Sequence, residues 1–106
     1  FQVLQHRMVD MFMAAEQSVS MTYMVTLKLD EGARERALAA SGAKIQIGKA
    51  ARLISQEAVQ IHGGMGMTDE LNVGHFFKRL TMINTQFGDV DFHLKRYAAL
   101  SAKAAA

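Results

Sequence analysis

One uninterrupted helical pattern, residues 33–62, constrains the fold of this chain more than any other feature. Apolar or small side chains recur in it at alternating steps of three and four, which is the spacing of one helix face. At about 1.5 Å per residue, the helix would be about 45 Å long. That length exceeds the span of a compact domain of this size, so we expect the helix to pack against more than its own chain. The residues on this face are Ala37, Ala40, Lys44, Ile47, Ala51, Ile54, Ala58 and Ile61.

Small residues and one charge modify this face. Ser41, Gly48 and Ser55 flank it and would let a neighbouring helix approach closely. Lys44 lies on the face itself, where its stem can stay buried while its amine reaches water. The pattern therefore predicts close helix–helix contact along most of the segment.

Three further helical segments accompany this one. Residues 1–29 form the first, and we expect Gly32 to be its C-cap. A helix over 70–83 follows, with Thr68 or Asp69 as its N-cap, and a last helix follows Asp89, which can also be an N-cap. The expected inner faces are Leu4, Met8, Met11, Ala15, Ser18, Thr22, Val25 and Leu29 in the first segment, Leu71, Val73, Phe76, Phe77, Leu80 and Ile83 in the third, and Val90, Leu94, Tyr97 and Ser101 in the last.

The predicted fold is all-α, a four-helix up-and-down bundle forming one domain over 1–106. Two long antiparallel helices would have two shorter ones packed across them. The chain begins inside a helical pattern without an initiator Met, so we expect it to be a fragment of a longer chain.

Composition narrows the function classes. The chain has no cysteine, which excludes disulfides, thiolate chemistry and Cys-type zinc sites. Its apolar runs are far shorter than the roughly 20 residues needed to cross a bilayer, so we expect no membrane partner. The net charge of +2 and the scattered basic residues give no reason to expect nucleic acid.

The glycine-rich segment after the long helix has two interpretations. A helix C-cap followed by a tight turn explains Gly63 but explains Gly64 and Gly66 less well. Alternatively, backbone N–H groups unshielded by side chains approach a phosphate or another backbone. The amide of Gln60, one turn earlier, could bind a polar ligand edge or belong to a solvated face. Neither a Walker loop nor a Rossmann fingerprint is present, because no Gly-Lys-Ser/Thr follows and a helix precedes.

Other candidate groups favour structural roles. Asp89 and His93 are four residues apart and could hold a metal, but without a third ligand a cap plus a surface histidine explains them better, and we predict no metal site. Asp89 and Asp91 could be general bases, although carboxylates are favoured in a first helical turn anyway. No Ser/His/Asp arrangement is indicated.

The stretch Gln60-Ile-His-Gly-Gly-Met-Gly-Met-Thr-Asp-Glu70, coming off a long helix, resembles the C-terminal domain of acyl-CoA dehydrogenases, whose pattern is Gln-x-x-Gly-Gly-x-Gly-(Phe/Tyr)-x-x-Glu. The resemblance covers essentially the whole chain, including the first helix from Phe1 to Met11. It implies a tetrameric FAD flavoenzyme that oxidises the α,β bond of an acyl-CoA and passes electrons to an acceptor. Gln60, Gly63 and Gly64 would bind the adenine–pyrophosphate end of the FAD of a partner subunit. A helix end with exposed N–H groups would offer partial positive charge to that phosphate.

One departure concerns the catalytic base. The family's Tyr-Glu-Gly-Thr turn falls on Gln86-Phe87-Gly88-Asp89, so Phe87 occupies the position of the base and cannot take a proton. The base could come from a helix upstream of Phe1, from Asp89 or Asp91 after a backbone shift, or from another subunit. We prefer the last, a non-catalytic partner in a hetero-oligomer. The stretch 66–81, followed by Phe87-Gly88-Asp89, most resembles bacterial small subunits of pimeloyl-CoA-type dehydrogenases.

The resemblance sets the remaining expectations. The isolated fragment should be inactive and bind FAD weakly, because in the family most flavin contacts come from parts of the protein outside this domain. Homo- and hetero-oligomers both stay open, and the bacterial relatives suggest a cytoplasmic protein. The alternative is a helical oligomerisation or interaction module without flavin.

Overall fold

The computed structural model describes residues 2–63 and 72–105, which contain four α-helices, one 3-10 turn and no strand. The α-helices are α1 (Gln2–Leu27), α2 (Ala33–His62), α3 (Asn72–Thr85) and α4 (Val90–Ala105), and the 3-10 turn η1 spans Lys28–Asp30. The predicted all-α fold is confirmed, and α2 has the bounds predicted from its periodicity. In the described part of the chain no helix is long and apolar enough to span a membrane.

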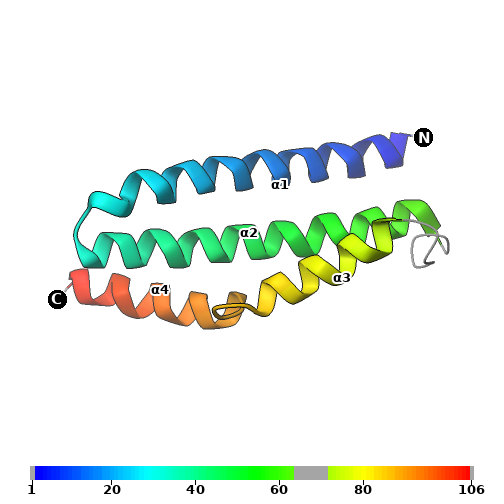
Figure 1. Cartoon of the computed structure of the whole chain (residues 1–106). Helices are drawn as coiled ribbons and strands as arrows, with labels where there is room; N and C mark the ends of the chain where they lie inside the picture. Colours follow the sequence, from blue (N-terminus) through cyan, green and yellow to red (C-terminus); the bar gives the residue numbers. More distant parts are fainter. Residues whose placement is uncertain (1, 64–71, 106) are drawn as a thin grey trace.

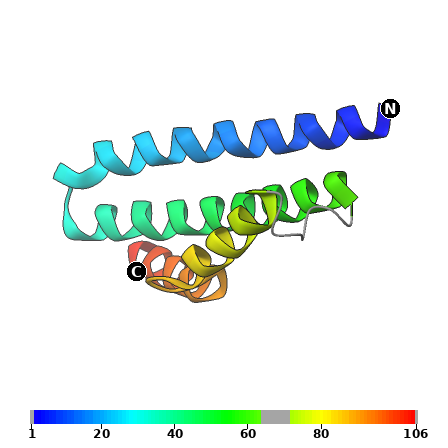
Figure 2. The ribbon, with the colours of Figure 1, turned by 45° about the vertical axis from the view of Figure 1, so that its right-hand side comes forward.

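Helix α2 lies in the middle of the molecule. α1 runs antiparallel along one side of it, and α3 and α4 follow each other along the opposite side (Figures 1 and 2). The molecule is elongated, at 51 × 27 × 22 Å. The two shorter helices therefore share the side of α2 that α1 leaves free.

The central position of α2 gives it two buried faces. Ala39, Ala43 and Ala50 are buried, and so are Ser41, Gly48 and Ser55. At about 100° per residue these two sets lie on opposite sides of the helix. The second set faces α3 and α4, because Ser41 contacts His93 and Gly48 lies against Asn84 and Val90.

The packing face predicted for residues 33–62 is therefore wrong in its position on α2. The prediction assumed one packing face, and the residues of that face lie along the edge between the two observed faces, where Ile47 and Ile54 are only half-buried. The small residues Ser41, Gly48 and Ser55 do admit a neighbouring helix closely, as predicted. Small side chains on both faces are what allow α2 to be packed from two sides.

Helix α1 is buried on a narrower face than predicted. Ala14 is its only buried residue, with Met11, Ser18 and Val25 half-buried beside it, whereas Leu4, Met8 and Leu29 of the predicted face are exposed. Two polar side-chain contacts join α1 to α2. Arg7 lies 3.5 Å from the Glu57 carboxylate, and Gln46 donates to Gln17 at 3.0 Å; other apolar side chains of α1 point outward, among them Val9, Phe12, Met13, Val19 and Tyr23.

Helices α1 and α3 end at Leu27 and Thr85, two residues from their predicted ends, and one predicted cap is wrong. Gly32 has φ −59° and precedes α2 as its N-cap, so it is not the left-handed C-cap predicted for the first helix. The chain leaves α1 through η1 instead. Asp89 is the N-cap of α4, as predicted, because its Oδ1 accepts the Phe92 N–H at 2.8 Å. The predicted caps Thr68 and Asp69 lie outside the described residues.

The inner faces of α3 and α4 also shift from the prediction. Phe76 is exposed, and Leu94 and Tyr97 of the predicted α4 face are exposed as well. The residue that α4 buries against α2 is His93, at 5% exposure. A polar residue takes the central position because partners on α2 and in the preceding turn satisfy its ring nitrogens.

Candidate functional site

The turn between α3 and α4 carries Phe87 and Gly88, which the family resemblance aligned with the turn that bears the catalytic base. Phe87 has φ 59° and Gly88 φ 99°. A left-handed backbone is unfavourable for a residue with a Cβ, so the surroundings must hold Phe87 in it. Lys44 donates to the Gln86 carbonyl at 2.8 Å, and the Phe87 side chain is 93% exposed. The turn is therefore fixed at its backbone while it presents an aromatic ring outward.

A series of hydrogen-bonded side chains, from the exposed Arg96 through the buried Ser41 and His93, reaches the backbone of this turn. Arg96 Nη1 donates to Ser41 Oγ at 3.0 Å, Ser41 Oγ lies 3.1 Å from His93 Nδ1, and His93 Nε2 lies 2.9 Å from the Phe87 carbonyl oxygen. A carbonyl only accepts, so Nε2 carries the proton that is donated to Phe87. Nδ1 of the neutral ring then accepts from the Ser41 hydroxyl. Each nitrogen of the ring therefore has a matched partner.

This Ser–His contact is not a nucleophilic dyad. Ser41 is 0% exposed, so no substrate can reach its hydroxyl. The acceptor behind the histidine is the neutral backbone carbonyl of Phe87, whereas a catalytic triad has a carboxylate in that place. The contact joins residues 52 positions apart, so no local sequence pattern could reveal it. The expectation of a surface histidine at 93 was wrong for the same reason.

Neither metal nor base chemistry is favoured at the start of α4. Asp89 is engaged as a helix cap, and both His93 nitrogens have partners. Among the residues that the structure describes, no group of three or more His, Asp or Glu could hold a metal ion. Asp89 and Asp91 are exposed, and they line the edge of a groove.

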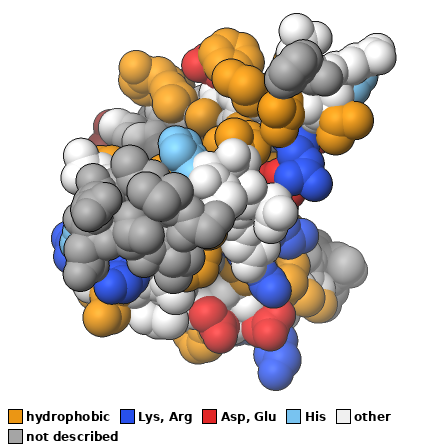
Figure 3. Space-filling view, turned by 90° about the vertical axis from the view of Figure 1, so that its right-hand side faces the viewer, with side chains coloured by type: hydrophobic (Ala, Val, Ile, Leu, Met, Phe, Trp, Pro, Cys, Tyr) orange, Lys and Arg blue, Asp and Glu red, His pale blue; other side chains and the backbone are white. Residues whose placement is uncertain are grey.

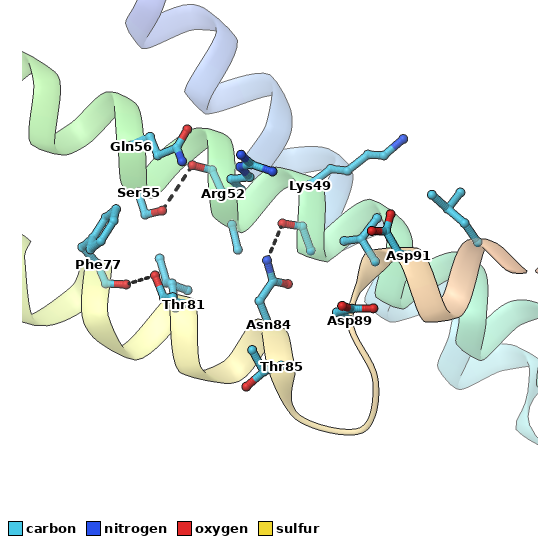
Figure 4. A pocket seen from close by; sticks show the side chains of 15 residues that line it. Lys49, Arg52, Ser55, Gln56, Phe77, Thr81, Asn84, Thr85, Asp89 and Asp91 are labelled. Atoms are coloured by element: carbon cyan, nitrogen blue, oxygen red, sulfur yellow. Dashed lines mark hydrogen bonds between the residues drawn. The ribbon is translucent and has the colours of Figure 1, made fainter. Parts of the chain in front are cut away.

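That groove lies between α2, α3 and α4 and encloses about 520 Å³. Asn84 reaches across it from α3 and donates to the Gly48 carbonyl at 3.1 Å (Figure 4). The α2 wall carries Lys49 and Arg52, and the opposite edge carries Asp89 and Asp91. Its apolar lining consists of Ala51, Phe77, Leu80, Val90 and Leu94.

The predicted cofactor-binding residues lie at the far end of α2. Gln60 is exposed on the last turn, and Gly63 ends the helix with φ 64°. The Gly63 N–H donates to the Gln60 carbonyl, so it is not free for a phosphate. The C-terminal end of a helix carries partial negative charge, which corrects the expectation that this helix end itself attracts phosphate. Gly64 lies outside the described residues.

The two predicted sites are therefore separate in this chain. Gln60 and Gly63 are at one end of α2, and the turn at Phe87 packs near its middle through Lys44, Ser41 and the contacts of Gly48. Figure 3 views the molecule from the end at which α1 begins and α2 ends, and hydrophobic side chains gather there along the side of α1.

Comparisons with known proteins agree with the motif. The family model for "Acyl-CoA dehydrogenase, C-terminal domain" matches residues 1–100. The human very long-chain specific acyl-CoA dehydrogenase of mitochondria is 32% identical over 100 residues, which are 94% of this chain and 15% of that protein. The acyl-CoA dehydrogenase IpdE2 of Mycolicibacterium smegmatis is 32% identical over 79 residues, 74% of this chain and 24% of its own length.

These relatives are much longer than the chain, which spans less than a quarter of their length. No solved structure gives a significant match. The helical fold, the helix that ends at Gly63 and the family match over residues 1–100 point to one conclusion. The chain belongs to the acyl-CoA dehydrogenase family and corresponds to its C-terminal domain.

Proposed function

We propose that residues 1–106 are the C-terminal helical domain of a longer flavoprotein that oxidises the α,β bond of an acyl-CoA thioester. The observation that carries this proposal is the family match over residues 1–100, supported by relatives named as acyl-CoA dehydrogenases. FAD, when bound, supplies the hydride acceptor. An electron acceptor must then reoxidise the flavin.

The exposed end of α2 has features that suit contact with a cofactor bound mainly by another subunit. Gln60 is exposed, and its amide has both donors and an acceptor. Gly63 lacks a Cβ, and among the described residues no atom beyond its chain neighbours and its own helix backbone lies within 4 Å of where one would be, so these residues leave room for a ligand to come close to its backbone. Gln60, Gly63 and Gly64 would hold the adenine–pyrophosphate part of FAD bound chiefly by a partner subunit, with phosphate donors supplied after Gly63.

The outer face of α1 supports an oligomer. Phe12 and Tyr23 are more than 60% exposed, and Val9, Met13 and Val19 are exposed beside them. Burying apolar side chains of this size stabilises an interface by about 1.5–3 kcal/mol each. A second copy and a different subunit are both suitable partners for this face.

The turn at Phe87 would line the flavin and acyl region without supplying a base. A phenyl ring has no proton-accepting group, and the neighbouring Asp89 carboxylate caps α4. The base would then come from another subunit, which makes this chain the non-catalytic partner in a hetero-oligomer. A bacterial, cytoplasmic acyl-CoA oxidation system is the setting we propose.

The central test is anaerobic flavin reduction in the intact protein, purified with its co-expressed neighbouring subunit. We expect bound flavin whose absorption maximum bleaches on addition of a medium-chain or dicarboxylyl-CoA. Repeating the titration without the neighbouring subunit should leave the flavin oxidised if that subunit carries the base. Absence of bound flavin from the complex would contradict the proposal and leave a helical interaction module.

The proposed contact between Gln60 and FAD can be tested by comparing two glutamine substitutions on α2. Replacing Gln60 with alanine should weaken FAD retention by about tenfold, the usual effect of one lost net hydrogen bond. Gln56→Ala, one turn earlier and also exposed, should retain FAD like the wild type. Dissociation of FAD during dialysis of the intact protein measures both. Equal retention by the two variants would contradict the role of Gln60.

A further inference from the structure

We propose that His93 is the positioning residue that fixes the turn at Phe87, with Ser41, itself bonded to Arg96, as the partner of its other ring nitrogen. The effect of His93 on flavin chemistry depends on the function proposed above. Its effect on the turn does not depend on that function, because it follows from contacts within this chain.

The hydrogen bonds in this chain of side chains have one consistent direction. The Phe87 carbonyl can only accept, so in the neutral ring Nδ1 is left to accept the Ser41 proton, while a lone pair of the Ser41 oxygen accepts from Arg96. The ring then carries its proton on Nε2, which donates to the Phe87 carbonyl at 2.9 Å. Arg96 on α4 in turn holds the Ser41 hydroxyl that bonds the ring.

The turn needs such a donor. Phe87 has φ 59°, a region that residues with a Cβ rarely adopt. The neighbouring carbonyl of Gln86 is held by Lys44 at 2.8 Å. Two consecutive carbonyls are therefore fixed by two side chains from different helices, and one of these side chains is buried.

Packing alone would not require a histidine here. The site is 5% exposed, and a leucine of similar size would fill it without leaving polar ring atoms to satisfy. The imidazole costs desolvation that its two partners offset. Its distinguishing contribution is the donor that reaches Phe87, at the position where the family resemblance places the catalytic residue.

Three variants of His93 separate this role from packing. A glutamine at this position can place its N–H donor near the position of Nε2, and an asparagine can place one only near Nδ1. A leucine fills the space without a donor. In the intact protein, hydrogen–deuterium exchange of peptides covering residues 84–93 reports the turn. We expect exchange about tenfold faster in His93→Asn and His93→Leu, the effect of one net hydrogen bond, and near wild-type exchange in His93→Gln.

The control and the functional readout make the outcomes distinct. His75→Asn, at an exposed histidine of α3, should leave exchange in the turn unchanged. A wild-type rate in His93→Leu, or a His93→Gln variant as fast as His93→Leu, would overturn the proposal. In the flavin-containing complex, the substrate-driven bleaching rate should fall in His93→Leu and recover in His93→Gln. A complex without flavin would refute the proposed function, while the exchange result would still decide the role of His93.

Discussion

Replacing Gly48 with alanine should lower the free energy of unfolding of the chain by about 2 kcal/mol. A Cβ built on Gly48 would lie 2.6 Å from Val90 Cγ2 and 2.7 Å from Asn84 Oδ1. Both distances are shorter than real contacts allow, so the Val90 and Asn84 side chains, or the helices that carry them, must shift. Alanine would gain up to about 1 kcal/mol of helix propensity, but the steric cost exceeds that gain.

The cost is large because Asn84 cannot move freely. Its Nδ2 donates to the Gly48 carbonyl at 3.1 Å, so a shift of its side chain also weakens that hydrogen bond, worth about 0.5–1.5 kcal/mol net. Urea unfolding followed by circular dichroism would measure the change.

Gly42→Ala in the same helix is the matched control. A Cβ there would lie 3.5 Å from Tyr97 Cε2, an ordinary contact. Because helix propensity is then the main contribution, we expect this substitution to raise the free energy of unfolding by about 0.5–1 kcal/mol. If the two variants changed stability in the same direction, the close approach at Gly48 would not matter to the fold.

Replacing Gly88 with alanine should also be costly, by about 2–3 kcal/mol, and should disturb the turn. The backbone there has φ 99°, where an alanine costs roughly 1–2 kcal/mol. Its Cβ would also lie 2.5 Å from Phe92 Cδ1 and 3.0 Å from His93 Nε2. The second contact involves the nitrogen that donates to Phe87, so the substitution would strain that hydrogen bond as well.

Gly32→Ala provides the comparison for Gly88. Its φ is −59°, and in the described part of the chain no atom beyond its chain neighbours lies within 4 Å of the added Cβ. Away from special backbone and packing sites, substitutions usually change stability by no more than about 0.5 kcal/mol. A similar small change at Gly88 in the same urea series would mean that the turn can relax around a side chain.

Much of the fold followed from local sequence. The period of 33–62 and the glycine after it predicted the bounds of α2, because helix propagation and termination depend on neighbours along the chain. The cap at Asp89 was predicted for the same reason, since its carboxylate bonds an N–H only three residues away. The motif from Gln60 to Glu70 also led to the family, which the comparison over residues 1–100 then showed.

The sequence by itself thus determined the helical class, the bounds of its central helix and the family. Only the tertiary structure decided which faces are buried, because α2 is packed from two opposite sides and its periodicity alone could not reveal two faces. It also decided the role of His93, whose partner Ser41 is 52 residues away. Hydrogen bonds over such separations depend on how helices pack, and that packing places a histidine where the spacing of apolar residues had predicted Leu94.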